Sequence, residues 1–577
     1  MFSGVAASRR VTHVGQAAAV DQSVTTPNAE RQGYNPLGPV GLPMGRKRAR
    51  GRRARKMREP AQRPAVRSLP PWFGPVAFLC ASAFYVTAIL LSPPLVGLYH
   101  DDGIYIGSAL SLARGDGYRI PHLPGSPLQA KYPPLYPLVL LPIAWIIGDN
   151  PTAIGLYRWP SVLATLGALA LLPGLFRRWG LSERAAFGAA VLCGLSTLLF
   201  QHALFALSEP VFLLLTIATF RLLPLEATSP TREIPPALCA AAAVLCRSIG
   251  IALIPALALR AWSRRRQPGA WIPFAASAMA AVLWSAASAW MRAIEKSRRL
   301  GSLYDYYLGY GGFIPGRLSD LATIVSTNAY AVWLSLGDLF LGWRWVGLET
   351  GLWAIPALIV GAFAVLAWRE LLRRDAAAGV YVITSVALIL IWPYDSVRFL
   401  IPLTPFIVAS AFMAAEQRLG TLPNIHWVSY ALVLISIVSC LIVDVTRFPS
   451  SSKLQIGAVE IDPGPFNQAA AWLKTHSEPD DVVISDHDPW VFLATGHRTL
   501  PPRNTNPLWA YGQPVESAAW STAWTEARRY KARWLILTYL WEPRSRELWM
   551  PRIVADRDTF ELRYQGPGIN IFALHPP

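Results

Sequence analysis

The chain has 577 residues, of which 53% are hydrophobic and only 15% are charged. This composition excludes an ordinary soluble domain, because too few polar side chains are present to cover its surface, and it favours a multi-pass membrane protein. The formal net charge of +18 leaves open the binding of nucleic acid, whose phosphates attract basic segments.

A basic tract at residues 46–58 carries nine of the positive charges and lies shortly before the first apolar segment. The positive-inside rule assigns such a tract to the cytoplasmic side of a membrane. A nucleic-acid-binding tail is the alternative, but no segment with interleaved aromatic residues follows the tract. Residues 1–70 are rich in Pro, Gly, Ala and Arg without sustained apolar periodicity, which predicts a disordered basic leader on the cytoplasmic side.

Apolar segments fill residues 71–446, the predicted transmembrane domain, in which each spanning helix needs about 20 apolar residues. About eleven crossings bring the basic clusters after the first span to the cytoplasmic side, provided that residues 134–148 do not cross. This stretch is short and rich in proline, so we expect it to lie along the membrane. The expected spans are residues 72–97, 159–176, 184–204, 209–225, 270–291, 351–368, 377–393, 398–415 and 424–445, with two short helices in 235–262.

Residues 447–577 differ in kind from the apolar region before them. Helix and strand patterns alternate here, which predicts a small α/β domain outside the cytoplasm. Because it has no glycine-rich phosphate loop, we assign it to packing or acceptor recognition. The expected helices are residues 465–476 and 517–530, and the expected strands are 480–486, 532–539, 559–565 and 569–575.

Charged residues interrupt apolar surroundings at several points that the predicted topology brings to one face. Charges at membrane depth are costly, so each needs a partner or a function. Ion pairs that hold helices together are one explanation for Glu209, Arg247 and Arg398. The full set is Asp101, Asp102, Lys131, Glu209, Arg247 and Arg398.

One reaction would use both the acids and the bases of this set. If a sugar is linked through phosphate to a lipid, its transfer needs a carboxylate to accept the proton of the acceptor hydroxyl. It also needs cations that stabilise the departing phosphate. Arginine can bind two phosphate oxygens at once, whereas lysine supplies a point charge.

Several segments, in this order, resemble the GT-C membrane glycosyltransferases of the protein mannosyltransferase and aminoarabinose transferase type. Within that group, the likeness is greatest to the bacterial branch related to rhizobial lipopolysaccharide glycosyltransferases. The resemblance extends from about residue 70 to residue 575. It is carried by "DDGIYIGSALSLARGDGY", "KYPPLYPLVLLP", "YRWPSVLATLGALALLPGLFRRWGLSERAAFGAAVL", "LSEPVFLLL" and "VRFLIPLTPF".

The resemblance implies inverting transfer from a polyprenyl-phosphate sugar on the extracytoplasmic face of a bacterial inner membrane. Asp101, four residues before Tyr105, matches the family's catalytic aspartate, and Asp102 occupies the place of its acidic neighbour. Glu209 matches an acidic residue of the second outer loop that assists Asp101 or contacts the acceptor. Tyr105 and Tyr132 are substrate-binding candidates.

The same resemblance assigns the donor phosphate to basic residues. Lys131 matches the family's basic residue before "PPL", and Arg398 matches an arginine before its "FLLPLxPF"-like segment. Arg247 stands where the family often has lysine. No cofactor is required, although Asp101 and Glu209 could hold Mg²⁺ or Mn²⁺ through their oxygens.

The expected partners are a polyprenyl-phosphate sugar donor, a glycan, lipid or protein acceptor, and membrane lipids, but no nucleic acid. Two other functions remain open: a transporter or flippase of lipid-linked saccharides, and a scaffold without catalytic activity. Four tyrosines between residues 304 and 310 could stack on sugar rings, but an aromatic belt at the membrane surface is favoured. They are Tyr304, Tyr306, Tyr307 and Tyr310.

Overall fold

The structure is a computed structural model of the chain. The predicted leader lies almost wholly outside the residues that it describes. These are residues 69–225, 229–298, 305–308, 317–342, 354–393, 397–419, 426–450, 454–456, 459–502, 524–538 and 543–575.

Five of the described helical stretches are long and apolar enough to cross a membrane. A sixth is gained if the bent pair α5 (Glu183–Gly194) and α6 (Thr197–Ala203) forms one span. Because the count of about eleven crossings also needs shorter helices, that number stays a prediction. The five are α1 (Phe73–Leu91), η1 with α4 (Ile154–Arg158, Trp159–Arg178), α10 (Ile272–Ser297), α12 (Leu318–Leu341) and η8 with α15 (Val397–Leu403, Thr404–Leu419).

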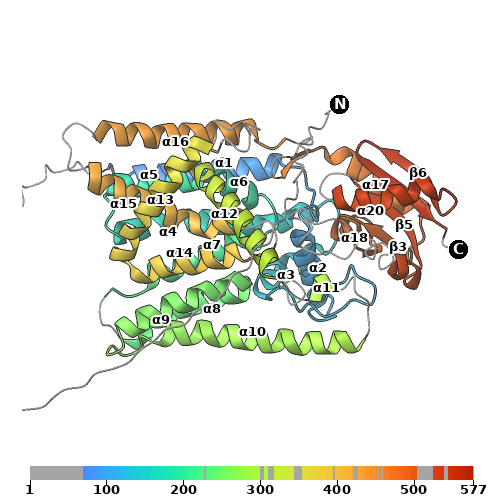
Figure 1. Cartoon of the computed structure of the whole chain (residues 1–577), viewed down its shortest axis with the longest axis horizontal. Coiled ribbons are helices and arrows are strands. Elements are labelled where there is room, and N and C mark those ends of the chain that lie inside the picture. Colours follow the sequence, from blue (N-terminus) through green and yellow to red (C-terminus); the bar gives the residue numbers. More distant parts are fainter. Residues whose placement is uncertain are drawn as a thin grey trace, which may run out of the picture. The chain divides into compact units, whose positions relative to one another are not determined.

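The other helices complete the bundle, and they follow one another along the chain in the order of the predicted apolar segments. α10 packs beside α8 and α9, and α13 packs beside α15 (Figure 1). The interruption expected near Arg247 separates α8 from the 3-10 helix η3 (Ser248–Ala252). The remaining elements are α2 (Asp101–Ala113), α3 (Leu135–Ile147), α7 (Ser208–Leu222), α8 (Ile234–Cys246), α9 (Leu253–Ser263), α11 (Asp305–Leu308), α13 (Ala354–Arg374), α14 (Ala376–Leu390) and α16 (His426–Thr446).

Helix α12 lies in a part of the chain for which the sequence analysis predicted no spanning helix. Its mean hydropathy of 1.3 is the lowest of the five stretches, and the helix contains the polar residues Asp320, Asn328 and Asp338. Asn328 donates to the carbonyl oxygens of Ile389 and Trp392 at the end of α14. Asn328 is thus hydrogen-bonded inside the bundle, but its polarity lowers the hydropathy of the segment, and a prediction from hydropathy misses the helix.

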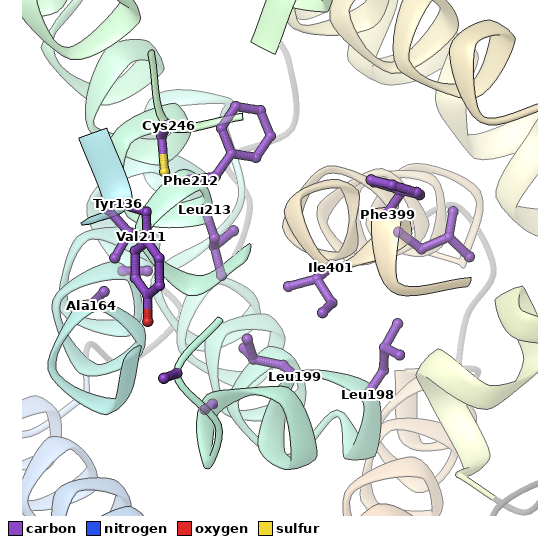
Figure 2. Close-up of a cluster of buried hydrophobic side chains, with 14 of the residues drawn as sticks. Tyr136, Ala164, Leu198, Leu199, Val211, Phe212, Leu213, Cys246, Phe399 and Ile401 are labelled. Carbon is purple, nitrogen blue, oxygen red and sulfur yellow. The ribbon is translucent and has the colours of Figure 1, made fainter. Parts of the chain in front are cut away.

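A hydrophobic cluster joins the ends of the helices that carry the candidate residues. Figure 2 shows Tyr136 of α3, Phe212 and Leu213 of α7, Cys246 of α8 and Phe399 of η8 around this cluster. All five side chains are buried. Because protein interiors are close-packed, these contacts fix the ends of α7, α8 and η8 relative to one another.

The C-terminal region confirms the expected small α/β domain. A hairpin of β1 (Leu454–Ile456) and β2 (Val459–Ile461) precedes a five-stranded sheet of order β4-β3-β5-β7-β6. Strands β4, β3 and β5 are parallel, whereas β7 and β6 are antiparallel to their neighbours. The remaining strands are β3 (Val482–Ser485), β4 (Arg498–Leu500), β5 (Ala532–Leu537), β6 (Phe560–Gly566) and β7 (Ile569–Leu574), and the helices are α17 (Pro463–His476), α18 (Asp488–Thr495) and α20 (Pro543–Ala555).

Helix α18, which the sequence analysis missed, docks this domain on α2 (Figure 1). Two glycines permit the close approach. A Cβ at Gly103 would lie 2.5 Å from Cβ of Pro489, and a Cβ at Gly97 would lie 2.7 Å from Cα of Trp490. Gly97 also has a positive φ of 88°, a backbone conformation that favours glycine.

We expect Gly97→Ala to loosen this docking. Gly117→Ala is the matched control, because Gly117 has a φ of 86° but no atom within 4 Å of an added Cβ. Both variants carry backbone strain of about 1–2 kcal/mol, but only Gly97→Ala also displaces α18. Its unfolding temperature in detergent should be lower than that of the control, and its C-terminal domain should be cleaved faster by protease. Equal behaviour of the two variants would contradict a tight contact at Gly97.

Candidate active site

Asp101 begins α2 and is almost completely buried, with 4% of its surface exposed. The hydroxyl of Tyr132 donates to Oδ1 of Asp101 at 2.6 Å, and Nη2 of Arg398 forms an ion pair with Oδ2. Burial favours the neutral acid, but Arg398 and His100 hold the pKa of Asp101 well below its usual range. The carboxylate is therefore ionised and oriented by partners from two other segments.

Glu209, in the first turn of α7, forms the second carboxylate position. Its Oε2 lies 2.7 Å from Nη1 of Arg247, and its Oε1 lies 3.5 Å from Nε of Arg398. Arg398 thus contacts both acids, so that two carboxylates alternate with two guanidinium groups. Such alternation is what makes buried charge tolerable.

Tyr105 is connected to this cluster through Ser208. The Ser208 hydroxyl accepts from Nη1 of Arg247 at 2.7 Å and meets the Tyr105 hydroxyl at 3.0 Å. The phenol and the guanidinium are therefore held in one hydrogen-bond network at the start of α7.

Lys131 lies beside the same cluster and is 4% exposed. Burial lowers its pKa to about 7, although the negative charge of Asp101 opposes the shift. Its Nζ lies 5.3 Å from the centre of the Tyr132 ring. Near neutral pH, an anion that binds beside this lysine therefore stabilises its protonated form.

Asp102 does not join the cluster. Its Oδ2 accepts from the amide of Gly97 and its Oδ1 from the amide of Gly103, both at 2.8 Å. Burial raises the pKa of Asp102 to about 6, against these two amides. The structure thus brings together seven of the eight candidates and leaves Asp102 to close the turn before α2.

The residues present do not fit the Mg²⁺ or Mn²⁺ considered for Asp101 and Glu209. Both carboxylates are already paired with guanidinium groups. Among the described residues, no group of three or more His, Cys, Asp or Glu side chains could hold a metal ion. A hard cation usually requires six or more oxygen ligands.

A second polar cluster, on the other side of Asp101, escaped the sequence analysis. It contains His100, His122, Tyr307 and Asp488. The aromatic-belt interpretation was wrong for Tyr307, which is 1% exposed and donates to Asp488. The other three side chains of the predicted belt lie outside the described residues. The available signal was "SDHD" at residues 485–488, which overlaps the end of the predicted strand 480–486.

We expect Asp102→Asn to destabilise the protein, because the amide group of asparagine would turn a donor toward a backbone N–H. Loss of one such buried hydrogen bond costs about 1–3 kcal/mol. Thermal unfolding in detergent should detect a lower midpoint. Asp116→Asn, at an exposed aspartate of the following loop, is the control and should unfold like the wild type. An unchanged midpoint for Asp102→Asn would contradict its role in the turn.

Comparisons with known proteins concern the family and the fold of the chain. Residues 131–393 match the model of glycosyltransferase family 87, whereas no curated protein matches the chain. Two solved structures of ArnT from Cupriavidus metallidurans share the fold at 14% sequence identity. The apo structure has a TM-score of 0.51 over 86% of this chain and 97% of ArnT. The structure bound to undecaprenyl phosphate has a TM-score of 0.52 over 87% and 98%.

The solved structures and the family match support two different predictions from the sequence, the fold and the class of reaction. The likeness to ArnT over nearly the whole of both chains concerns the architecture. The family match concerns the class of reaction, and its residues include Lys131, Glu209 and Arg247. The fold is that of the solved ArnT structures, and residues 131–393 match a family of glycosyltransferases, so both findings support the predicted resemblance to GT-C membrane glycosyltransferases.

Proposed function

We propose that the protein transfers a sugar, with inversion, from a polyprenyl-phosphate donor to an acceptor hydroxyl on the extracytoplasmic face of a bacterial inner membrane. The observation that carries this proposal is the buried cluster in which Arg398 contacts both Asp101 and Glu209, beside Lys131. The binding of undecaprenyl phosphate by ArnT, which has the same fold, supports a donor of this kind.

Lys131 and Arg398 bind the donor phosphate. Arg398 suits this task because its side chain is 23% exposed, whereas Glu209 and Arg247 are almost fully enclosed. A guanidinium group can bind two phosphate oxygens at once. The singly charged phosphodiester of the donor therefore competes with the carboxylates for Arg398, and its negative charge stabilises the protonated form of Lys131.

Asp101 is the general base. While it is paired with Arg398 it is a weak base, because that charge stabilises the carboxylate. When the phosphate attracts Arg398, Asp101 loses part of this stabilisation and accepts a proton more readily. The carboxylate thus gains basicity only when a donor is present, which protects the site from unproductive proton transfer.

The transfer is a direct displacement at the anomeric carbon. Asp101 takes the proton of the acceptor hydroxyl, and the hydroxyl oxygen forms the new glycosidic bond. The bond between the anomeric carbon and the phosphate oxygen breaks on the opposite face, and its electron pair leaves with the polyprenyl phosphate. Lys131 and Arg398 stabilise that developing charge.

Tyr132, Glu209 and Arg247 keep the reacting groups in place. The hydroxyl of Tyr132 fixes Oδ1 of Asp101, which leaves the proton-accepting lone pairs in a defined direction. The pair of Glu209 and Arg247 limits how far Arg398 can move. Tyr105 completes the wall of the sugar site through Ser208.

We expect Asp101→Asn to abolish transfer while the protein remains folded in the membrane. A general base contributes about 10²- to 10⁴-fold to the rate, and asparagine cannot accept the proton. Mass spectrometry of envelope glycans and polyprenyl-phosphate sugars measures the outcome in cells that lack the protein and carry either version. The lipid-linked donor should accumulate with Asp101→Asn and disappear with the wild type. Wild-type transfer by the variant would exclude Asp101 as the base.

We expect the affinity for undecaprenyl phosphate to fall as the pH rises above about 7. Lys131 then loses its proton, whereas a phosphate monoester with a second pKa near 6 keeps its charge. The loss should be at most about tenfold for each pH unit. Lys131→Arg is the matched control, because arginine stays charged and its affinity should be constant from pH 7 to 9. A flat profile for the wild type would argue against contact between Lys131 and the phosphate.

A further inference from the structure

Asp488 reaches the membrane domain from the carboxyl edge of the C-terminal sheet. It follows β3 by three residues and is the first residue of α18. Polar groups that act on ligands lie commonly at this edge of parallel strands. Asp486 secures the loop, since its carboxylate accepts from both the amide and the hydroxyl of Thr538 at the end of β5.

The docking of α18 determines where Asp488 lies. Pro489 rests on Gly103 and Trp490 on Gly97, at distances that leave no room for a Cβ on either glycine. These glycines flank the start of α2, where His100 and Asp101 stand. The C-terminal domain therefore holds a carboxylate against the residue that precedes the proposed base.

Asp488 is 1% exposed, and three side chains surround it. Its Oδ1 lies 3.5 Å from Nε2 of His100, and its Oδ2 lies 3.3 Å from Nε2 of His122. The Tyr307 hydroxyl donates to Oδ2 of Asp488 and lies 3.1 Å from Nε2 of His100. If Nε2 carries a proton in both His100 and His122, every contact has a donor and an acceptor.

The other ring nitrogen of His100 faces the proposed base. Nδ1 lies 4.0 Å from Oδ1 of Asp101, the same oxygen that accepts from Tyr132. His100 also has a positive φ of 64°, a strained conformation for a residue with a side chain. Strain of this kind persists where surrounding contacts impose it, often at active sites. The imidazole is thus held between two carboxylates.

The charges of the neighbours agree with this arrangement. Burial opposes a charged imidazole, but the nearby carboxylates of Asp101 and Asp488 raise the pKa of His100 to about 9. Burial lowers the pKa of His122, and it lowers that of His487 to about 3. At neutral pH, one cation therefore lies between two anions, with neutral histidines behind it. Tyr307, whose hydroxyl lies 3.1 Å from Nε2, is a further titratable group that faces His100.

We propose that Asp488 is a positioning residue for Asp101 and acts through His100, so that the C-terminal domain completes the catalytic site. This inference rests on the proposed glycosyl transfer. The Asp488 carboxylate fixes the ring and the charge of His100, and His100 in turn orients the Asp101 carboxylate toward the acceptor hydroxyl.

A double-mutant cycle tests this inference with Asp488→Asn, His100→Gln and the double variant. The donor is the polyprenyl-phosphate sugar that accumulates in cells lacking the protein. Asp488→Asn should lower kcat by about 10- to 100-fold, as loss of a carboxylate that orients a histidine does, with little change in KM for the donor. In the His100→Gln background it should have no further effect. Full additivity, or an unchanged kcat for Asp488→Asn, would overturn the proposal.

Two further variants separate positioning from folding. Asp488→Glu retains the charge and should recover part of the lost kcat, whereas a purely structural defect would not be rescued. Glu561→Gln is the matched control. It removes an exposed carboxylate that lies 3.0 Å from His575 in the same domain, and kcat should stay at the wild-type value.

The coupling between Asp488 and His100 can be measured without substrate, so it can be tested separately from the proposed sugar transfer. Hydrogen exchange at the C2 position of each histidine, followed by mass spectrometry of the full chain, reports the protonation of His100. Asp488→Asn should lower the pH midpoint of His100, and Glu561→Gln should leave it unchanged. An unshifted His100 midpoint would falsify the coupling even in an active enzyme. A shifted midpoint in a protein that transfers no sugar would instead count against glycosyl transfer.

Discussion

Buried charge is the constraint on which the rest of the membrane domain depends. Asp101, Glu209, Arg247 and Arg398 lie in four segments, and none of them could be enclosed without the others. Removing one partner from a buried ion pair typically costs about 3–5 kcal/mol, because the remaining charge is left uncompensated. The convergence of α2, α7, η8 and the break after α8 is therefore an electrostatic requirement as well as a matter of hydrophobic packing.

Interrupted helices are the structural means by which these charges meet. Arg247 stands in extended backbone between α8 and η3, and Arg398 lies in a 3-10 helix that precedes α15. A side chain at a break can leave the helix face and reach inward, while neighbouring helices satisfy the freed backbone groups. The apolar cluster of Figure 2 lies beside these breaks. It fixes the backbone so that the charged side chains need little rearrangement.

The site residues could be predicted from the sequence where a charged residue, which is costly to bury, interrupts an apolar segment. Lys131, Glu209 and Arg247 were identifiable because charge is rare in apolar segments, and the predicted topology brought them to one face. Asp488 was not identifiable in this way, because acids are ordinary after a strand in a water-soluble domain. Its importance depends on the docking of α18, which rests on glycines at residues 97 and 103. Helix α12 was not predicted because Asn328 and other polar residues lower its mean hydropathy.

The docking of the C-terminal domain changes how the acidic pair at the start of α2 is understood. Asp102 closes the turn by accepting from the amides of Gly97 and Gly103, the same two glycines against which Pro489 and Trp490 pack. A single local structure thus sets the first residue of α2, permits the approach of α18 and isolates Asp101 for chemistry. Adjacent carboxylates can take opposite roles because backbone amides satisfy Asp102, whereas the side chains of Tyr132 and Arg398 contact Asp101. This division explains why an acidic pair, rather than a single aspartate, stands at the membrane boundary.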